Sequence, residues 1–188
     1  PYKKRKVRIL NGAHTAFVPG SWVAGFDIVR DCMHDETIRG FMNTMLYDEV
    51  IPTLAADLDV EDCKAFTAAV ENRFDNPFID HALLSICLNS TAKWRARDLP
   101  TLKDYVAETG NLPKCLSTSL ATLIAFYTQE LVAREGDGLH LRRADGTEYT
   151  AQDDAFVLDF YAAHACVEDA ELVHDVLTNE QMWGEDLT

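Results

Sequence analysis

Hydrophobic residues recur along most of this chain at intervals of three and four residues, the spacing of amphipathic α-helices. This period covers Val60–Phe74, where Asp59 can cap the first turn. Pro77 suits the first position of a helix predicted over residues 77–88, and Pro113 opens another helix. The wide apolar face of this last helix is predicted to lie in the core and comprises Leu116, Leu120, Leu123, Ile124, Tyr127 and Leu131.

The end of the chain continues the helical pattern around one stretch of strand pattern. Helices are predicted over Ala155–Ala163 and residues 168–177, and a capping-box pattern at residues 178–181 precedes a final short turn. Residues 139–150 instead alternate around Asp145-Gly146, the commonest two-residue hairpin signal. The sequence therefore predicts an all-α, multi-helix domain with one small β-hairpin near residues 139–150.

Length and composition indicate one globular domain with an acidic surface. The 188 residues match the usual size of a domain, and 47% of them are hydrophobic. The formal net charge of −14 argues against a nucleic-acid surface, because phosphates require a basic stripe. No segment approaches the roughly 18 apolar residues of a membrane span. Five cysteines without a C-x-x-C pair are typical of reduced thiols, which predicts a cytoplasmic protein.

Standard catalytic and cofactor motifs do not account for this chain. Gly136 and Gly138 lack the third glycine and the strand–helix unit of a dinucleotide-binding fingerprint. His164 and Cys166 could share a metal ion, but side chains two residues apart on a helix diverge. No metal site is therefore expected.

The opening residues carry the clearest chemical pattern. On an ideal helix, Lys6 shares a face with the apolar Leu10 and Phe17. Asn11 and His14 flank that lysine on one side. A lysine among apolar side chains loses hydration, which lowers its pKa and makes it a usable acid/base near neutral pH. The adjacent amide and imidazole can hydrogen-bond a substrate oxygen as charge develops on it.

Other interpretations of this stretch stay open. Residues 1–8 contain five cations and no acid, and residues 3–7 look like a nuclear-import signal that runs directly into a helix. The stretch could also be a frayed basic arm of a non-enzymatic helical interaction module, with His14 in the core. Such a module would have a mobile Lys6 and an Arg73 remote from His14.

The spacing of Lys6, Asn11 and His14 within residues 6–15 resembles the catalytic segment of the long-chain mannitol dehydrogenase family. The resemblance continues through residues 24–26 and 71–77, residues 88–90 with Lys93, and residues 99–102, and more faintly through residues 183–187. Members of this family are polyol and uronate oxidoreductases. The resemblance implies that the lysine is the general acid/base, and that the asparagine and histidine bind and polarise the reacting oxygen.

The resemblance also implies a domain organisation. Residues 1–188 match the family's helical C-terminal domain, which is similar to that of 6-phosphogluconate dehydrogenase-like enzymes, while the N-terminal Rossmann NAD-binding domain is absent. The chain is therefore expected to bind substrate, to hold no cofactor residues or metal, and to be inactive alone. Its expected partners are a small-molecule sugar acid and its own nucleotide-binding domain, without nucleic acid or membrane. The exposed domain interface could also support self-association.

The substrate is expected to be a uronate. The runs at residues 11–15 and 76–81 are closest to the tagaturonate reductase (altronate oxidoreductase) branch, which uses NAD in hexuronate catabolism. Fructuronate reductase and mannitol 2-dehydrogenase remain alternatives. Arg73 matches the family's substrate-contacting arginine, and arginine binds carboxylates with a two-pronged geometry. His81 is a second candidate substrate-binding residue. Lys93 and Arg97 are interpreted as helix surface and domain-interface residues.

Overall fold

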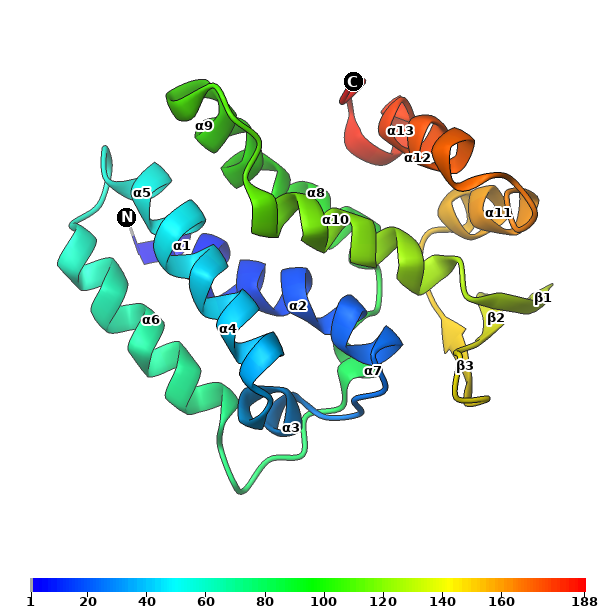
Figure 1. Cartoon of the computed structure of the whole chain (residues 1–188), viewed down its shortest axis with the longest axis horizontal. Helices are drawn as coiled ribbons and strands as arrows, with labels where there is room; N and C mark the ends of the chain where they lie inside the picture. The colour runs from blue at the N-terminus through cyan, green and yellow to red at the C-terminus, as the bar shows by residue number, and fades with distance from the viewer. Residues whose placement is uncertain (1) are drawn as a thin grey trace.

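A helical rod runs through the middle of the molecule and carries the opening residues into the core (Figure 1). The computed structural model describes residues 2–188. Three segments form the rod without a break: α1 (Tyr2–Arg5), the π-helical turn η1 (Lys6–Asn11) and α2 (Gly12–Val23). Because α2 is buried almost all round, other elements must enclose it.

Helices from the first two thirds of the chain pack around α2. They are α3 (Val29–His34), α4 (Glu36–Thr44), η2 (Met45–Val50), α5 (Ile51–Leu54), α6 (Val60–Phe74), α7 (Leu83–Ile86), α8 (Ser90–Arg97), α9 (Leu99–Thr109) and α10 (Lys114–Tyr127). α10 lies along α2, and α6 forms the opposite flank (Figure 1). As predicted, α6 follows Asp59, whose carboxylate accepts a hydrogen bond from the Asp62 N–H, and α10 follows Pro113.

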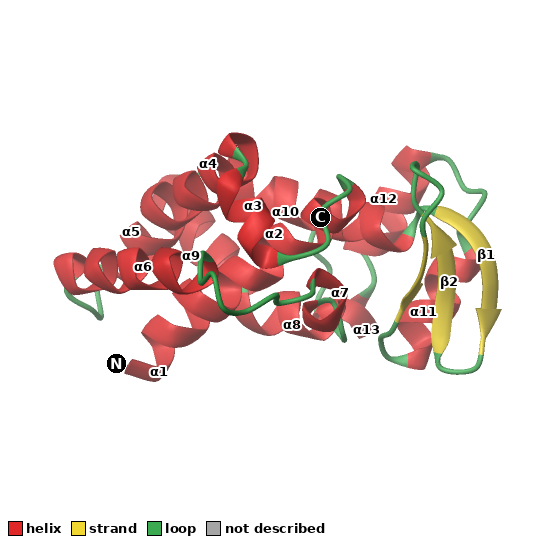
Figure 2. Ribbon diagram, turned by 90° about the horizontal axis from the view of Figure 1, so that it is seen from below, coloured by secondary structure: helices red, strands yellow, loops and turns green. Residues whose placement is uncertain are grey.

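A small antiparallel sheet lies at one end of the molecule, beyond the helices (Figure 2). Its order is β1 (Glu130–Glu135), β2 (Gly138–Arg142) and β3 (Glu148–Ala151). β2 and β3 form the predicted hairpin, and Gly146 in its turn has a φ of 89°, a conformation that favours glycine. The sequence did not predict β1, which pairs with β2 through a bulge between Leu131 and Ala133.

The predicted C-terminal helices are present. They are α11 (Ala155–Ala163), α12 (Asp169–Leu177) and α13 (Glu180–Trp183). Asn179 caps α13, because its side chain accepts a hydrogen bond from the Met182 N–H. The Trp183 indole donates to the Val176 carbonyl at 2.7 Å and meets the buried Trp94 ring edge-on, which attaches this end of the chain to α8.

Two predicted helices are wrong in extent. α10 ends at Tyr127, so Leu131 lies in β1. Within residues 77–88 only α7 is helical, because partners outside the segment hold the preceding backbone in a loop. The Val29 N–H donates to the His81 carbonyl at 3.0 Å, and the Arg30 guanidinium donates to the Pro77 carbonyl at 3.0 Å. These contacts override the local helix-start signal and fix the position of His81.

Within residues 2–188, the helices are too short or too polar for any of them to span a bilayer.

Candidate functional site

A π-helical turn brings the candidate catalytic residues closer to one side of the rod. In η1 the Gly12 N–H donates to the Val7 carbonyl, five residues earlier. Because a π turn contains one more residue than an α turn, Lys6 and Asn11 lie nearer the same face than on an ideal α-helix. His14 follows three residues after Asn11 and is close to it on the helix surface.

Lys6 is exposed, whereas Leu10 and Phe17 are buried. The predicted burial of Lys6 among these apolar side chains is therefore wrong. The extra residue in η1 changes the helical register on which that prediction depended. Any desolvation of Lys6 would have to come from something other than residues 2–188.

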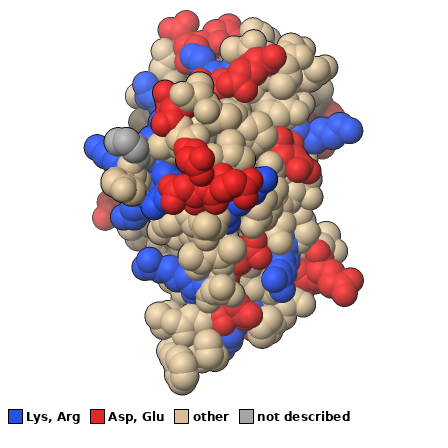
Figure 3. Space-filling model, turned by 90° about the vertical axis from the view of Figure 1, so that its left-hand side faces the viewer, with Lys and Arg blue, Asp and Glu red and all other residues tan. Residues whose placement is uncertain are grey.

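Three of the five cations of the basic N-terminal arm form ion pairs. Figure 3 views this end of the molecule and shows Lys and Arg side chains interspersed with Asp and Glu side chains. The ion pairs of the arm are Lys4–Asp57, Arg5–Asp62 and Arg8–Asp104. The arm is thus attached to the segments around α5, α6 and α9. This arrangement differs from the free arm that an interaction module would present.

His14 is half-buried among aromatic rings and favours its uncharged form. Its ring stacks on Phe74 at a centroid distance of 4.0 Å and meets the His81 ring edge-on at 5.5 Å. Burial, together with nearby positive groups, lowers the pKa of His14 to about 3. Its Nε2 atom is buried and has no hydrogen-bond partner among residues 2–188. A neutral imidazole with a free ring nitrogen can hydrogen-bond a substrate oxygen.

Basic side chains from three parts of the fold converge on His14. Those that lower its pKa, in descending order of effect, are His81, Arg73, Arg97 and Lys93. Arg73 is in the last turn of α6, His81 is in the loop before α7, and the other two are on α8. The structure therefore brings Arg73 and His81 to His14, and the interaction module's expectation of a remote Arg73 is wrong.

Lys93 and Arg97 are the members of this cluster that the sequence interpretation placed at the surface. Both are half-buried. The Arg97 Nη1 donates to the Thr15 Oγ1 at 2.9 Å, and the Lys93 Nζ donates to the Ile86 carbonyl at 2.9 Å. Their spacing of four residues, on a helix that also carries the buried Trp94, was the available signal that they share one face.

A buried carboxyl group lies behind the cluster, against the rod. Asp98 is 1% exposed, and its Oδ2 has no hydrogen-bond partner. Burial raises the pKa of Asp98 well above its usual value, although the charges of Arg97 and Arg8 oppose this shift. A Cβ at position 12 would lie 2.8 Å from Asp98 Oδ1, so Gly12 allows the close approach. This carboxyl group favours its uncharged form.

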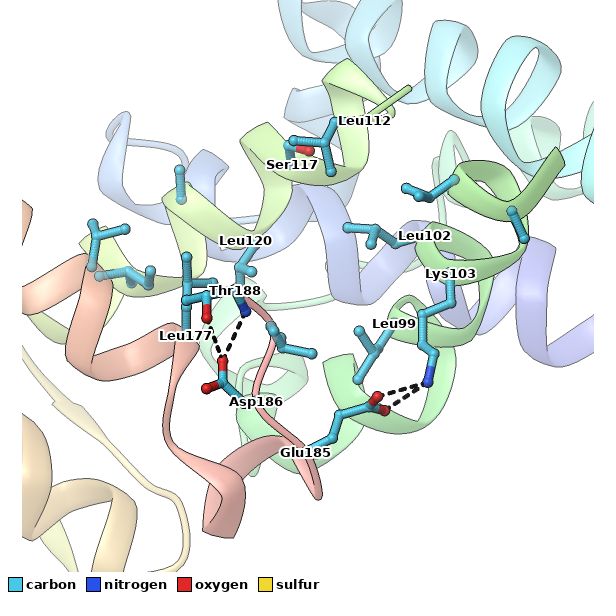
Figure 4. Close-up of a pocket in the computed structure, with 16 residues that line it drawn as sticks. Leu99, Leu102, Lys103, Leu112, Ser117, Leu120, Leu177, Glu185, Asp186 and Thr188 are labelled. Carbon is cyan, nitrogen blue, oxygen red and sulfur yellow. Dashed lines mark hydrogen bonds and ion pairs between the residues drawn. The ribbon is translucent and has the colours of Figure 1, made fainter. Parts of the chain in front are cut away.

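A groove lined mainly by aliphatic side chains is separate from the His14 cluster. It has a volume of about 620 Å³ and lies between α9, α10, α12 and the C-terminal residues (Figure 4). Its lining is mainly aliphatic and includes Leu99, Leu102, Val106, Leu120, Ile124 and Leu177. A Lys103–Glu185 ion pair of 2.7 Å spans part of it. An aliphatic lining of this kind suits the binding of an apolar surface better than the binding of a sugar acid.

The described residues offer no arrangement for a metal ion or a dinucleotide. Residues 2–188 contain no group of three or more His, Cys, Asp or Glu side chains placed to hold a metal. His164 bonds the Phe160 carbonyl and Asp175 instead. The sheet described here is antiparallel, so it lacks the parallel strand–helix unit that binds a dinucleotide.

Comparison with known proteins identifies the family. The family model of the mannitol dehydrogenase C-terminal domain matches residues 1–188. The chain belongs to this family. The altronate oxidoreductase of Yersinia enterocolitica is 43% identical over the whole chain, which covers 37% of that protein. Those of Pectobacterium atrosepticum and Escherichia coli O7:K1 are 44% and 42% identical, with 38% and 37% of their lengths covered.

Two solved structures share the fold. The Pseudomonas fluorescens mannitol 2-dehydrogenase, in a ternary complex with NAD and D-mannitol, matches with a TM-score of 0.79 and 22% identity. The match covers 97% of this chain and 34% of that enzyme. A D-sorbitol dehydrogenase in substrate-free form matches with a TM-score of 0.68 and 18% identity, over 99% of this chain and 33% of its own. The predicted helical fold and the family resemblance are thus confirmed.

Proposed function

We propose that this chain is the substrate-binding and catalytic C-terminal domain of a cytoplasmic NAD-dependent oxidoreductase that interconverts tagaturonate and altronate. The observation that carries the proposal is the half-buried His14, whose Nε2 has no hydrogen-bond partner within residues 2–188 and which lies near basic side chains, one helical turn from Asn11. A positively charged site suits an anionic sugar acid. The 43% identity to an altronate oxidoreductase supports the same substrate. Because the chain spans about 37% of that relative, the remaining domain would hold the cofactor.

The residues of this chain would bind the substrate and move its proton. NAD, when bound to the other domain, supplies or accepts the hydride at the reacting carbon. In the reduction, the Asn11 amide and the neutral His14 ring hydrogen-bond the carbonyl oxygen and stabilise the charge that develops there. The Lys6 ammonium donates a proton to that oxygen. In the oxidation, neutral Lys6 removes the hydroxyl proton.

Lys6 must be covered by a second protein surface to act as the general acid/base. Its ammonium is exposed within residues 2–188, so this part of the protein does not desolvate it. A nucleotide-binding domain that covers η1 would remove water from Lys6 and lower its pKa. The proposal therefore assigns the activation of Lys6 to the interface between the two domains, and it expects the isolated chain to be inactive.

A test of this function compares Lys6 variants in the full-length enzyme. Lys6→Ala should reduce turnover roughly 10²- to 10⁴-fold, the usual contribution of a positioned general acid/base. Lys6→Arg should rescue poorly, because a guanidinium stays protonated and cannot act as the base. The assay is NADH consumption with tagaturonate, fructuronate and fructose offered in parallel.

Lys3→Ala is the matched control, since it removes a neighbouring exposed cation of the same arm. Lys3→Ala should keep full turnover, and cofactor binding should change little in any of these variants. Near-native turnover of Lys6→Ala would contradict the mechanism. A clear preference for fructuronate or fructose would keep the mechanism and assign the enzyme to fructuronate reductase or mannitol 2-dehydrogenase.

A further inference from the structure

Two cations of α8 face the rod from the same side of their helix. Lys93 and Arg97 are four residues apart, so they are neighbours on the helix surface. Arg97 reaches α2, where its Nη1 donates to the hydroxyl of Thr15, the residue that follows His14. Lys93 bonds the carbonyl of Ile86 at the end of α7. The two side chains therefore lie near His14, where α2, α7 and α8 meet.

Neither cation has an acidic partner. Most arginines of this acidic chain form ion pairs within residues 2–188, but Lys93 and Arg97 form none there. Partial burial lowers the pKa of each cation. Like charges four residues apart on a helix also repel each other.

The nearest acids do not neutralise this pair. Asp98, beside Arg97, is fully buried, and its raised pKa favours the uncharged form. Asp153, the acid that acts on Lys93, already accepts hydrogen bonds from the Tyr127 hydroxyl and the Thr91 N–H. Lys93 has two further N–H donors and Arg97 has four beyond the hydrogen bonds that they make here.

We propose that Lys93 and Arg97 form the seat of the substrate carboxylate and thereby select a sugar acid over a neutral sugar. This assignment rests on the proposed function and sharpens it, because it places the carboxylate between these two cations rather than at Arg73, which is exposed at the end of α6. A carboxylate between the two cations would replace the missing acidic partner and accept charge-assisted hydrogen bonds. The reacting oxygen would remain with Asn11 and His14.

The experiment measures charge selectivity in the full-length enzyme. Lys93→Met and Arg97→Met remove each charge and keep most of the side-chain volume. Each should raise the KM for tagaturonate about 10- to 100-fold, the loss expected for a charge-assisted hydrogen bond, with little change in kcat. The kcat/KM for fructose, a neutral ketose, should stay the same or rise. Arg97→Lys should recover part of the selectivity.

Arg95→Met is the matched control. It removes a cation from the same helix, but Arg95 is exposed, lies against Gly184 and is not among the groups that act on His14. Its selectivity should equal that of the wild type. A second measurement is the inhibition of fructose reduction by altronate. The Lys93 and Arg97 variants should weaken this inhibition by the same factor by which they raise the KM for tagaturonate.

The outcomes separate the two proposals. If the wild type reduces tagaturonate but the variants lose activity equally on tagaturonate and fructose, the carboxylate seat is wrong and the proposed function stands. If the wild type reduces no tagaturonate, the proposed function fails. Inhibition by altronate then tests the carboxylate seat on its own, and inhibition that persists unchanged in both variants would overturn the carboxylate seat.

Discussion

At the scale of single residues, burial determines the protonation states of the site. His14 is half-buried and Asp98 is fully buried, and the loss of hydration makes each favour its uncharged form. The two groups respond to pH in opposite directions. Stability linked to His14 is present above its unfolded pKa of 6.5 and is lost as the pH falls toward about 3. Stability linked to Asp98 is present at low pH and is lost as the pH rises through its raised pKa.

Replacing His14 should reveal its share of this pH dependence. His14→Phe keeps a ring to stack on Phe74 and removes the titrating group. In the wild type, His14 opposes folding by up to about 1.4 kcal/mol for each pH unit below 6.5. The drop in unfolding free energy between pH 7 and pH 4.5 should therefore be smaller in the variant, by about 2 to 3 kcal/mol.

Urea unfolding at the two pH values measures this difference. His34→Phe is the control, because His34 is exposed and pairs with Asp75 at the surface. It should show nearly the wild-type pH dependence. An identical drop in His14→Phe and the wild type would mean that the His14 ring is not buried in solution.

At the scale of elements, the junction of η1 and α2 depends on a glycine. A Cβ at Gly12 would lie 2.8 Å from Asp98 Oδ1, closer than side chains approach one another. Gly12→Ala should therefore destabilise the domain by about 1 to 3 kcal/mol, as overpacking does, despite the higher helix propensity of alanine. Thermal unfolding of the isolated chain measures the effect.

The opposite effect on stability is expected for Gly40→Ala, which serves as the control. Gly40 also lies within a helix, α4, but a Cβ there would meet nothing within 4 Å. This substitution should be neutral or stabilising by up to about 1 kcal/mol, because alanine loses less backbone entropy on folding. Equal effects of the two substitutions would contradict the close packing of Asp98 against η1.

At the scale of the whole molecule, the chain leaves an apolar groove open. Leu112 is 69% exposed and Val173 is 40% exposed at its lining. The isolated chain should therefore bind a hydrophobic dye such as anilinonaphthalene sulfonate in its folded state. Leu112→Asp should reduce the fluorescence increase several-fold without lowering the unfolding temperature by more than a few degrees.

Leu88→Asp is the comparison for this measurement. Leu88 is also exposed, but it lies between α7 and α8 and does not line the groove. Dye binding should be unchanged in this variant. A loss of dye binding equal to that of Leu112→Asp would indicate that the dye reports general loosening of the fold rather than the groove.

Local sequence signals predicted many of the elements. Asp59 and Pro113 begin helices as expected, because caps and prolines act on the next few residues alone. Asp145-Gly146 likewise forms the hairpin turn. The same kind of signal failed at Pro77, since Val29 and Arg30 hold the preceding loop through long-range hydrogen bonds. The sequence had no local means to predict that competition.

The sequence by itself determined the helical class, the hairpin, the family and the segment that carries Lys6, Asn11 and His14, because these depend on spacing along the chain. Only the tertiary structure decided the environment of that segment. The packing of α6, α7 and α8 against α2 surrounds His14 with positive groups, and the π turn leaves Lys6 exposed. Burial and charge proximity depend on which helices pack together, and spacing along the chain does not encode them directly.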